Sequence, residues 1–164
     1  MKELTNSVTR RTFFSAGGLG ALAALGGPRF LAAQTQGSLG TAVSLEVQQA
    51  NVQVVNSFCA AFADRDPARA LSLIADDCVY RLTQTRPPII GHEAVAEQVT
   101  SFIERGAEFK VLRTVVLGPI VLNERDDIFP NGFGANRTPV TFHVTAGLFF
   151  VEDGKISEWT DYLV

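Results

Sequence analysis

The stretches IVLNERDDIF (Ile120–Phe129) and GKISEWTDY (Gly154–Tyr162) each set carboxylates inside otherwise apolar, strand-like sequence. Side chains alternate between the two faces of a strand, so Arg125 and Asp127 share one face of the first stretch. By the same alternation, Asp161 shares a face with the apolar residues two positions to either side of it. If these faces meet in one cavity, two carboxylates flank a guanidinium. That arrangement suits acid–base chemistry on a neutral substrate.

The sequence around these stretches predicts a sheet that forms late in the chain. Alternating or apolar runs predict strands over residues 109–117, 120–129, 139–151 and 156–164. Gly118-Pro119 indicates a turn, the Gly- and Asn-rich segment 130–138 indicates a loop, and residues 152–155 indicate a hairpin turn. Consecutive strands joined by such short connections are expected to pair antiparallel.

The part of the domain before these strands is mostly helical by pattern. Apolar residues recur at helical spacing over residues 47–62, and Asp66-Pro67 indicates the capped start of a short helix that includes Ile74. A short strand is expected over residues 78–83 and a third helix over residues 91–105. This order favours an α+β domain in which three helices cover the concave face of a curved, mostly antiparallel sheet and enclose a pocket.

The first 33 residues resemble an export signal rather than a part of the fold. Arg10-Arg11 precedes an apolar run over residues 15–27, and small residues follow up to Ala33. The arginine pair resembles that of a twin-arginine signal, which implies export to the periplasm by the twin-arginine machinery. An uncleaved membrane anchor is the alternative. We expect a linker over residues 34–44 and one domain over residues 45–164.

The composition favours a globular domain that does not bind nucleic acid. Hydrophobic residues make up 46% of the 164 residues, and twelve of them are phenylalanine. The whole chain carries a net charge of −3, but residues 1–33 hold four basic residues and one acidic residue, so the remainder carries −6. A chain with this balance and no basic patch lacks the electrostatic footprint of a nucleic-acid-binding protein.

The sequence offers no spacing typical of metal ligands. His92 and His143 lie far apart, and neither is near Cys59 or Cys78. The two cysteines are expected to be buried free thiols, with a disulfide in an oxidising compartment as the alternative. We expect His143 to be packed or hydrogen-bonded within its strand rather than catalytic.

The order of elements and two motifs together resemble the limonene-1,2-epoxide hydrolase family. The motifs are Arg125-Asp126-Asp127 and, on the last strand, Gly154-Lys155-Ile156 leading to Trp159-x-Asp161-Tyr162. Tyr80 in the short strand and Gly91-His92-Glu93-Ala94-Val95 at the third helix fall in matching order. The resemblance covers residues 46–164. It implies the cone-shaped, nuclear transport factor 2-like (SnoaL-like) fold that steroid isomerases share, and a homodimer formed through the sheet.

The resemblance implies a role for each polar residue. Asp161 matches the aspartate that activates a water, Asp127 matches the aspartate that protonates the epoxide oxygen, and Arg125 matches the arginine that bridges them. Tyr80 matches a tyrosine that helps to hold the water. The family's asparagine, a second holder of the water, is replaced by Leu82, which can neither donate nor accept a hydrogen bond. No cofactor is implied.

The resemblance also implies a pocket for a small apolar substrate. Its expected lining is Cys59, Phe62, Leu82, Phe102, Phe129, Trp159 and Leu163. The expected reaction is one-step hydrolysis of a small apolar epoxide to a vicinal diol by general acid–base attack of water. Thr83 or Asn123 could replace the missing asparagine. Two alternatives stay open: a non-hydrolytic binder or isomerase of a hydrophobic small molecule, and a purely structural ion-pair network.

Overall fold

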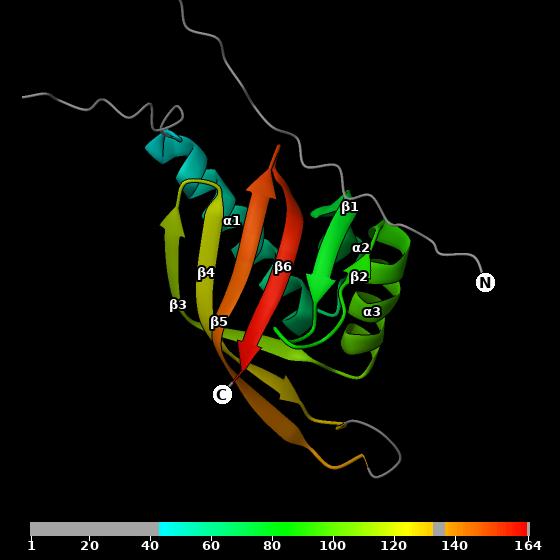
Figure 1. The fold of residues 1–164 in the computed structure, drawn as a ribbon. Coiled ribbons are helices and arrows are strands. Elements are labelled where there is room, and N and C mark those ends of the chain that lie inside the picture. Colours follow the sequence, from blue (N-terminus) through cyan, green and yellow to red (C-terminus); the bar gives the residue numbers. More distant parts are fainter. Residues whose placement is uncertain (1–42, 133–136, 164) are drawn as a thin grey trace, which may run out of the picture. The chain divides into compact units, whose positions relative to one another are not determined.

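The computed structural model describes residues 43–132 and 137–163, which form an α+β domain (Figure 1). The predicted export signal and linker residues 34–42 lie outside the described part. In that part the helices are α1 (Leu45–Ala63), α2 (Pro67–Ser72) and α3 (His92–Glu104). The strands are β1 (Ile74–Arg81), β2 (Ile89–Ile90), β3 (Glu108–Leu117), β4 (Ile120–Phe129), β5 (Val140–Glu152) and β6 (Lys155–Leu163). The predicted fold class is confirmed.

The strands form one sheet in the order β2-β1-β6-β5-β4-β3. Strands β3 to β6 are a meander of antiparallel pairs, as their short connections predict. Strand β6 pairs on its other edge with β1, and this pairing is parallel. The last strand therefore lies in the middle of the sheet, between β1 and β5, and its inward residues face the centre of the domain.

The helices begin where the sequence provides caps. The Ser44 hydroxyl accepts a hydrogen bond from the Val47 N–H at 3.2 Å at the start of α1. The Asp66 carboxylate accepts one from the Arg69 N–H at 3.0 Å, directly before Pro67 at the start of α2. Each cap satisfies a backbone donor that lacks a partner in the first turn of a helix.

The expected boundaries of the second helix and first strand are wrong. The helix ends at Ser72, and Ile74 is the first residue of β1, which extends to Arg81 rather than over residues 78–83. Ile74 is buried and pairs with Ile156 across the parallel ladder, a contact between distant segments that local spacing cannot predict. The short strand β2, which pairs with the end of β1, was not expected either.

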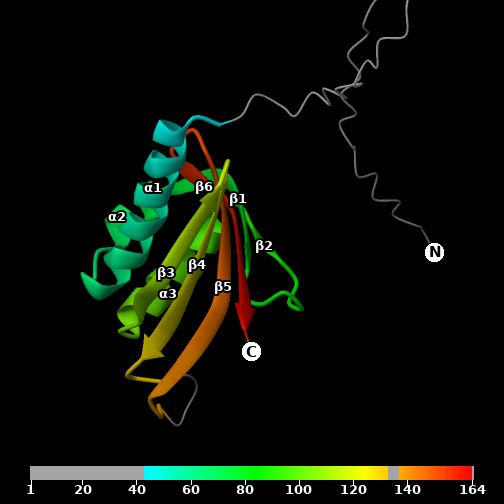
Figure 2. The same cartoon turned by 90° about the vertical axis from the view of Figure 1, so that its left-hand side faces the viewer.

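The helices cover one face of the curved sheet (Figures 1 and 2). Phe58 of α1 meets Trp159 of β6 and Phe149 of β5 edge to face, with ring centroids 5.2 and 6.2 Å apart. Phe62 of α1 stacks on Phe109 of β3 at 3.8 Å. All these rings are buried, so four of the phenylalanines fill the space between the helices and the sheet.

Two further findings concern the cysteines and the helices of the described part. Cys59 and Cys78 are both buried free thiols, as expected. No helix in the described ranges is long and apolar enough to cross a membrane.

Candidate functional site

Three charged side chains, Arg125, Asp127 and Asp161, are buried together on the concave face of the sheet. The Arg125 Nε donates to Asp127 Oδ1 at 2.7 Å, and its Nη2 donates to Asp127 Oδ2 at 3.1 Å. The same Nη2 donates to Asp161 Oδ1 at 2.7 Å. One guanidinium thus bridges two carboxylates from strands β4 and β6.

Gly147 of β5, the strand between β4 and β6, makes this bridge possible. Gly147 pairs with Asn123 on one side and with Asp161 on the other. A Cβ atom at position 147 would lie 1.9 Å from Arg125 Nη1 and 2.6 Å from Asn123 Oδ1. The guanidinium therefore occupies the space that any other side chain would fill. Sequence reasoning missed this residue, although a glycine inside a long strand is a known sign of close approach.

Further hydrogen bonds fix the orientation of the charged groups. Arg125 Nη1 donates to Asn123 Oδ1 at 3.0 Å, and Asn123 Nδ2 in turn points to the Cys59 sulfur at 3.5 Å. The Trp159 Nε1 donates to Asp161 Oδ1 at 2.7 Å. Both bonds to Asp161 end on Oδ1, so its Oδ2 is left for the cavity that Asp161 lines.

Tyr80 of β1 lies beside this network, with its hydroxyl close to Asp161. Its ring is buried and stacks on Trp159, with ring centroids 3.9 Å apart. The hydroxyl is close enough to Asp161 for the two groups to affect each other's pKa, yet it makes no hydrogen bond of ordinary geometry with any described residue. A buried hydroxyl without a partner is costly, so it marks a place for a water or a ligand.

Burial controls the protonation of the two carboxyl groups. It raises the pKa of Asp127 to about 6, although the Arg125 charge and hydrogen bonds act in the opposite direction. Burial also raises the pKa of Asp161 against the opposing effects of Arg125 and Trp159. Burial would lower the pKa of Arg125, but the two carboxylates outweigh it and raise that pKa. The arginine stays charged, and one carboxyl can hold a proton near neutral pH.

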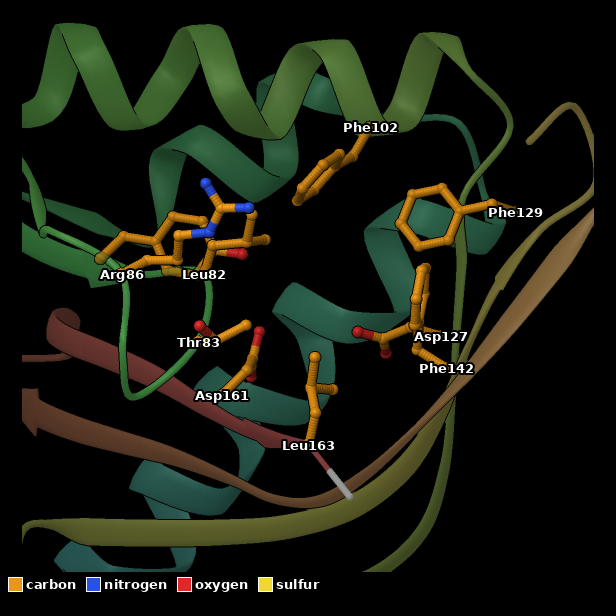
Figure 3. A pocket seen from close by; sticks show the side chains of 10 residues that line it. Leu82, Thr83, Arg86, Phe102, Asp127, Phe129, Phe142, Asp161 and Leu163 are labelled. Atoms are coloured by element: carbon orange, nitrogen blue, oxygen red, sulfur yellow. The ribbon is translucent and has the colours of Figure 1, made fainter. Parts of the chain in front are cut away.

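A cavity of about 330 Å³ opens above the carboxylates (Figure 3). Its lining includes the expected residues Tyr80, Leu82, Phe102, Asp127, Phe129, Asp161 and Leu163. It also includes Thr83, which was considered as a substitute for the missing asparagine, and Arg86 and Phe142, which sequence reasoning did not place there. Apart from two acids and one arginine, the lining is neutral and mostly apolar. A volume near the lower end of the usual range for ligand sites, about 300–1,000 Å³, suits a compact apolar molecule.

Four expected site residues are not part of the lining. Cys59 lies behind Asn123, Phe62 is stacked on Phe109, and Trp159 lies behind Asp161, where it donates its hydrogen bond. These three belong to the packed layer between helices and sheet, which corrects the expectation that they line the pocket. Arg125 is fully buried beneath the carboxylates and reaches the cavity only through them.

The two residues considered as substitutes for the missing asparagine are placed differently. Both polar atoms of the Asn123 side chain are engaged, one by Arg125 and the other at Cys59, and Asn123 does not line the cavity. Thr83 does line it, beside Leu82, and its hydroxyl lies 3.2 Å from the Thr85 hydroxyl. Of these two residues, only Thr83 places a polar side chain at the cavity, where it could bind a water.

Outside this site, the described residues contain no cluster of histidine, cysteine, aspartate and glutamate suited to a metal ion. His143 is half exposed, and its Nδ1 lies 2.9 Å from Asp126 Oδ1. Asp126 alternates with the inward Arg125 and Asp127 along β4, so this pair is on the other face of the sheet. His143 is hydrogen-bonded, as expected, but it is not packed in the core.

Comparisons with known proteins agree with this architecture. The chain is similar to an epoxide hydrolase of Mycobacterium tuberculosis described as LEH-like, at 28% identity over 72% of this chain and 85% of that one, with a TM-score of 0.63. It also resembles SalBIII, an epoxide hydrolase/cyclase-like enzyme in pyran ring formation of salinomycin, at 15% identity over 71% and 92% of the chains and a TM-score of 0.65.

A putative ketosteroid isomerase from Kribbella flavida has the same fold, at 17% identity over 71% of this chain and 79% of that one, with a TM-score of 0.59. A search of curated proteins by sequence finds no match. The model of the SnoaL-like domain matches residues 55–159, which contain Tyr80, Arg125, Asp127 and Gly147. These likenesses confirm the nuclear transport factor 2-like fold, which epoxide hydrolases, isomerases and cyclases share. This chain belongs to the family of SnoaL-like domains.

Proposed function

We propose that this protein hydrolyses a small apolar epoxide to a vicinal diol in one step, without a covalent intermediate. The observation that carries the proposal is the buried Asp127–Arg125–Asp161 bridge at the wall of an apolar cavity. A neutral epoxide needs a proton on its oxygen while water attacks its carbon. A pair of carboxyl groups that holds one proton supplies an acid and a base at the same pH.

In the proposed reaction, Asp161 is the base. Its Oδ2, which accepts a hydrogen bond from neither Arg125 nor Trp159, removes a proton from a water held between Asp161 and the Tyr80 hydroxyl. The water oxygen forms a bond to one epoxide carbon as the bond from that carbon to the epoxide oxygen breaks. Thr83 is the second side chain that can hold the water.

Asp127 is the proposed acid. Both of its oxygens accept hydrogen bonds from Arg125, but each carboxyl oxygen has a second lone pair that can carry the proton towards the cavity. Asp127 gives this proton to the epoxide oxygen, and Asp161 ends with the proton taken from water. Proton exchange between the two carboxyl groups through solvent restores the starting state, and the net change is the addition of one water.

The similarity to an LEH-like epoxide hydrolase at 28% identity supports the same assignment. The direct test is to measure diol formation from cyclic and aryl epoxides by the wild type, Asp161→Asn and Asp127→Asn. Removing a general acid or base is expected to lower kcat by roughly 10²–10⁴-fold. The control is Asp153→Asn in the exposed β5–β6 turn, where φ is 50° and asparagine is tolerated. Unchanged rates in both site variants would refute the proposal.

One observation favours a second function, the binding or isomerisation of a hydrophobic molecule without hydrolysis. Leu82 lines the cavity where the hydrolase pattern has a polar side chain, so the attacking water has one holder fewer. In this second case the wild type would bind apolar ligands and form no diol. A Leu82→Asn variant that gained hydrolysis would then identify the missing group.

Two further proposals concern the whole protein. We infer that it forms a homodimer through the face of the sheet that carries no helix in the described part, with Leu122, Leu148 and Phe150 in the contact. Sedimentation of the wild type and of Leu148→Lys tests this, since the charge should favour the monomer.

We also infer export through the twin-arginine pathway. Replacing Arg10 and Arg11 by lysine should keep the protein in the cytoplasm, as cell fractionation would show.

A further inference from the structure

A cationic side chain lines the otherwise apolar side of the cavity. Arg86 belongs to the loop between β1 and β2, together with Leu82 and Thr83, and all three line the cavity. Figure 3 shows Arg86 across the cavity from Asp127 and Phe142. The positive charge therefore lies across the cavity from Asp127, the proposed acid, and Asp161 lies between the two sides, beside Thr83.

Arg86 differs from most described arginines because its guanidinium has no protein partner. The side chains of Arg65, Arg69, Arg81, Arg113 and Arg125 each form an ion pair with a carboxylate. Within the described residues, no hydrogen bond or ion pair engages the Arg86 side chain. Five N–H donors are thus available at the cavity for an acceptor on a ligand.

The loop holds Arg86 in a defined place. The Arg86 N–H donates to the Thr83 carbonyl at 3.1 Å, which closes a turn, and Pro87-Pro88 restricts the backbone that follows. Three residues after Arg86, Ile89 pairs with Tyr80 of β1. The loop therefore begins at the end of β1 and returns to β1 through its pairing with β2. Its backbone, which carries Arg86, is held at a fixed position relative to Tyr80 and the proposed water site.

We propose that the natural substrate carries a carboxylate, which Arg86 binds while the epoxide lies at Asp127 and Asp161. This inference rests on the proposed hydrolysis and adds the substrate class. A guanidinium matches a planar carboxylate with two parallel hydrogen bonds, and Arg86 is the only cationic residue among those that line the cavity in the described part. A carboxylate bound at Arg86 therefore orients the ligand, because its other end then reaches Asp127 across the cavity. The cavity of about 330 Å³ limits the apolar part between the two groups to a compact ring or short chain.

The test compares three matched substrates: an epoxycyclohexane that bears a carboxylate, its methyl ester, and the analogue with a methyl group in its place. The wild type is expected to show a kcat/KM for the acid about tenfold above that for the ester, a modest gain because the exposed Arg86 remains partly hydrated. In Arg86→Gln this preference should disappear, and Arg86→Lys should retain part of it. Arg113→Gln, an exposed arginine outside the cavity, is the matched control and should keep the full preference.

A binding measurement separates this inference from the proposed reaction. Calorimetry with cyclohexane carboxylate and its methyl ester requires no epoxide chemistry. Tighter binding of the acid by the wild type, lost in Arg86→Gln, would support the carboxylate site even if no epoxide were hydrolysed. Equal kcat/KM values for acid and ester, with equal effects of Arg86→Gln on both, would overturn the inference and leave the proposed hydrolysis intact.

Discussion

Replacing Gly147 by alanine is expected to break the site from a residue that carries no functional group. The added Cβ would lie 1.9 Å from Arg125 Nη1. Non-bonded heavy atoms approach comfortably at about 3.5 Å, so the guanidinium would have to move by roughly 1.5 Å. A movement of that size is incompatible with keeping the 2.7 Å bonds to Asp127 and Asp161.

Both stability and activity should suffer from this change. Overpacking in a core costs about 1–3 kcal/mol, and breaking a buried ion pair costs about 3–5 kcal/mol, so we expect Gly147→Ala to lose several kcal/mol of unfolding free energy. A misplacement of about 1 Å can cost roughly 10²-fold in rate. Urea unfolding and kcat measurements on the same preparation test the two effects.

Two comparison variants isolate the effect of the contact between the added Cβ and Arg125. Gly154→Ala adds a Cβ that meets nothing within 4 Å and only strains a residue with φ of 73°, so it should cost about 1 kcal/mol and leave kcat unchanged. In an Arg125→Met background the flexible side chain can yield, and Gly147→Ala should cost much less than in the wild type. A stable, fully active Gly147→Ala protein, or equal costs in both backgrounds, would refute the proposed role of the glycine.

The remaining predictions concern protonation and the groups around Asp161. Because the pKa of Asp127 is raised to about 6, the folded protein keeps a proton that the unfolded chain releases near pH 4. The free energy of unfolding, measured with urea, should therefore fall by about 2 kcal/mol as the pH rises from 4 to 6, and kcat should fall about tenfold per pH unit above 6. Tyr80→Phe removes a hydroxyl without a described partner, so stability should hold while kcat falls by at least about tenfold. Trp159→Phe removes a donor to Asp161, so carboxyl resonances in NMR titrations should show a higher pKa for Asp161.

The local pattern of apolar and polar residues was sufficient to predict much of the fold. The inward face of β4, with Arg125 and Asp127 on it, follows from strict alternation, and the burial of every second residue from Val121 to Phe129 shows it. The helix caps at Ser44 and Asp66 are equally local. That Asp161 lies at the same cavity as Asp127 could be expected only from the family resemblance. The two residues are on β6 and β4, which are separated in the sheet by β5, so no local pattern connects them.

Other features depend on contacts between distant segments. The register of β5 shifts between Val144 and Gly147, so even-numbered residues face inward before this irregularity and odd-numbered residues face inward after it. A single alternating phase cannot describe such a strand, which is why Phe142 and Gly147 were missed. Local spacing likewise cannot predict the parallel pairing of Ile74 with Ile156, which joins β1 to β6. Nor can it predict the pairing of Ile89 with Tyr80, which closes the loop that carries Arg86.

The most direct test of the central claim is a single-turnover reaction in ¹⁸O-water with enzyme in excess over an epoxide. If Asp161 activates water without forming a covalent bond, the diol of the first turnover carries the ¹⁸O label and the protein carries none. An unlabelled diol, with ¹⁸O appearing in the Asp161 or Asp127 carboxyl group afterwards, would show attack by the protein and contradict the account.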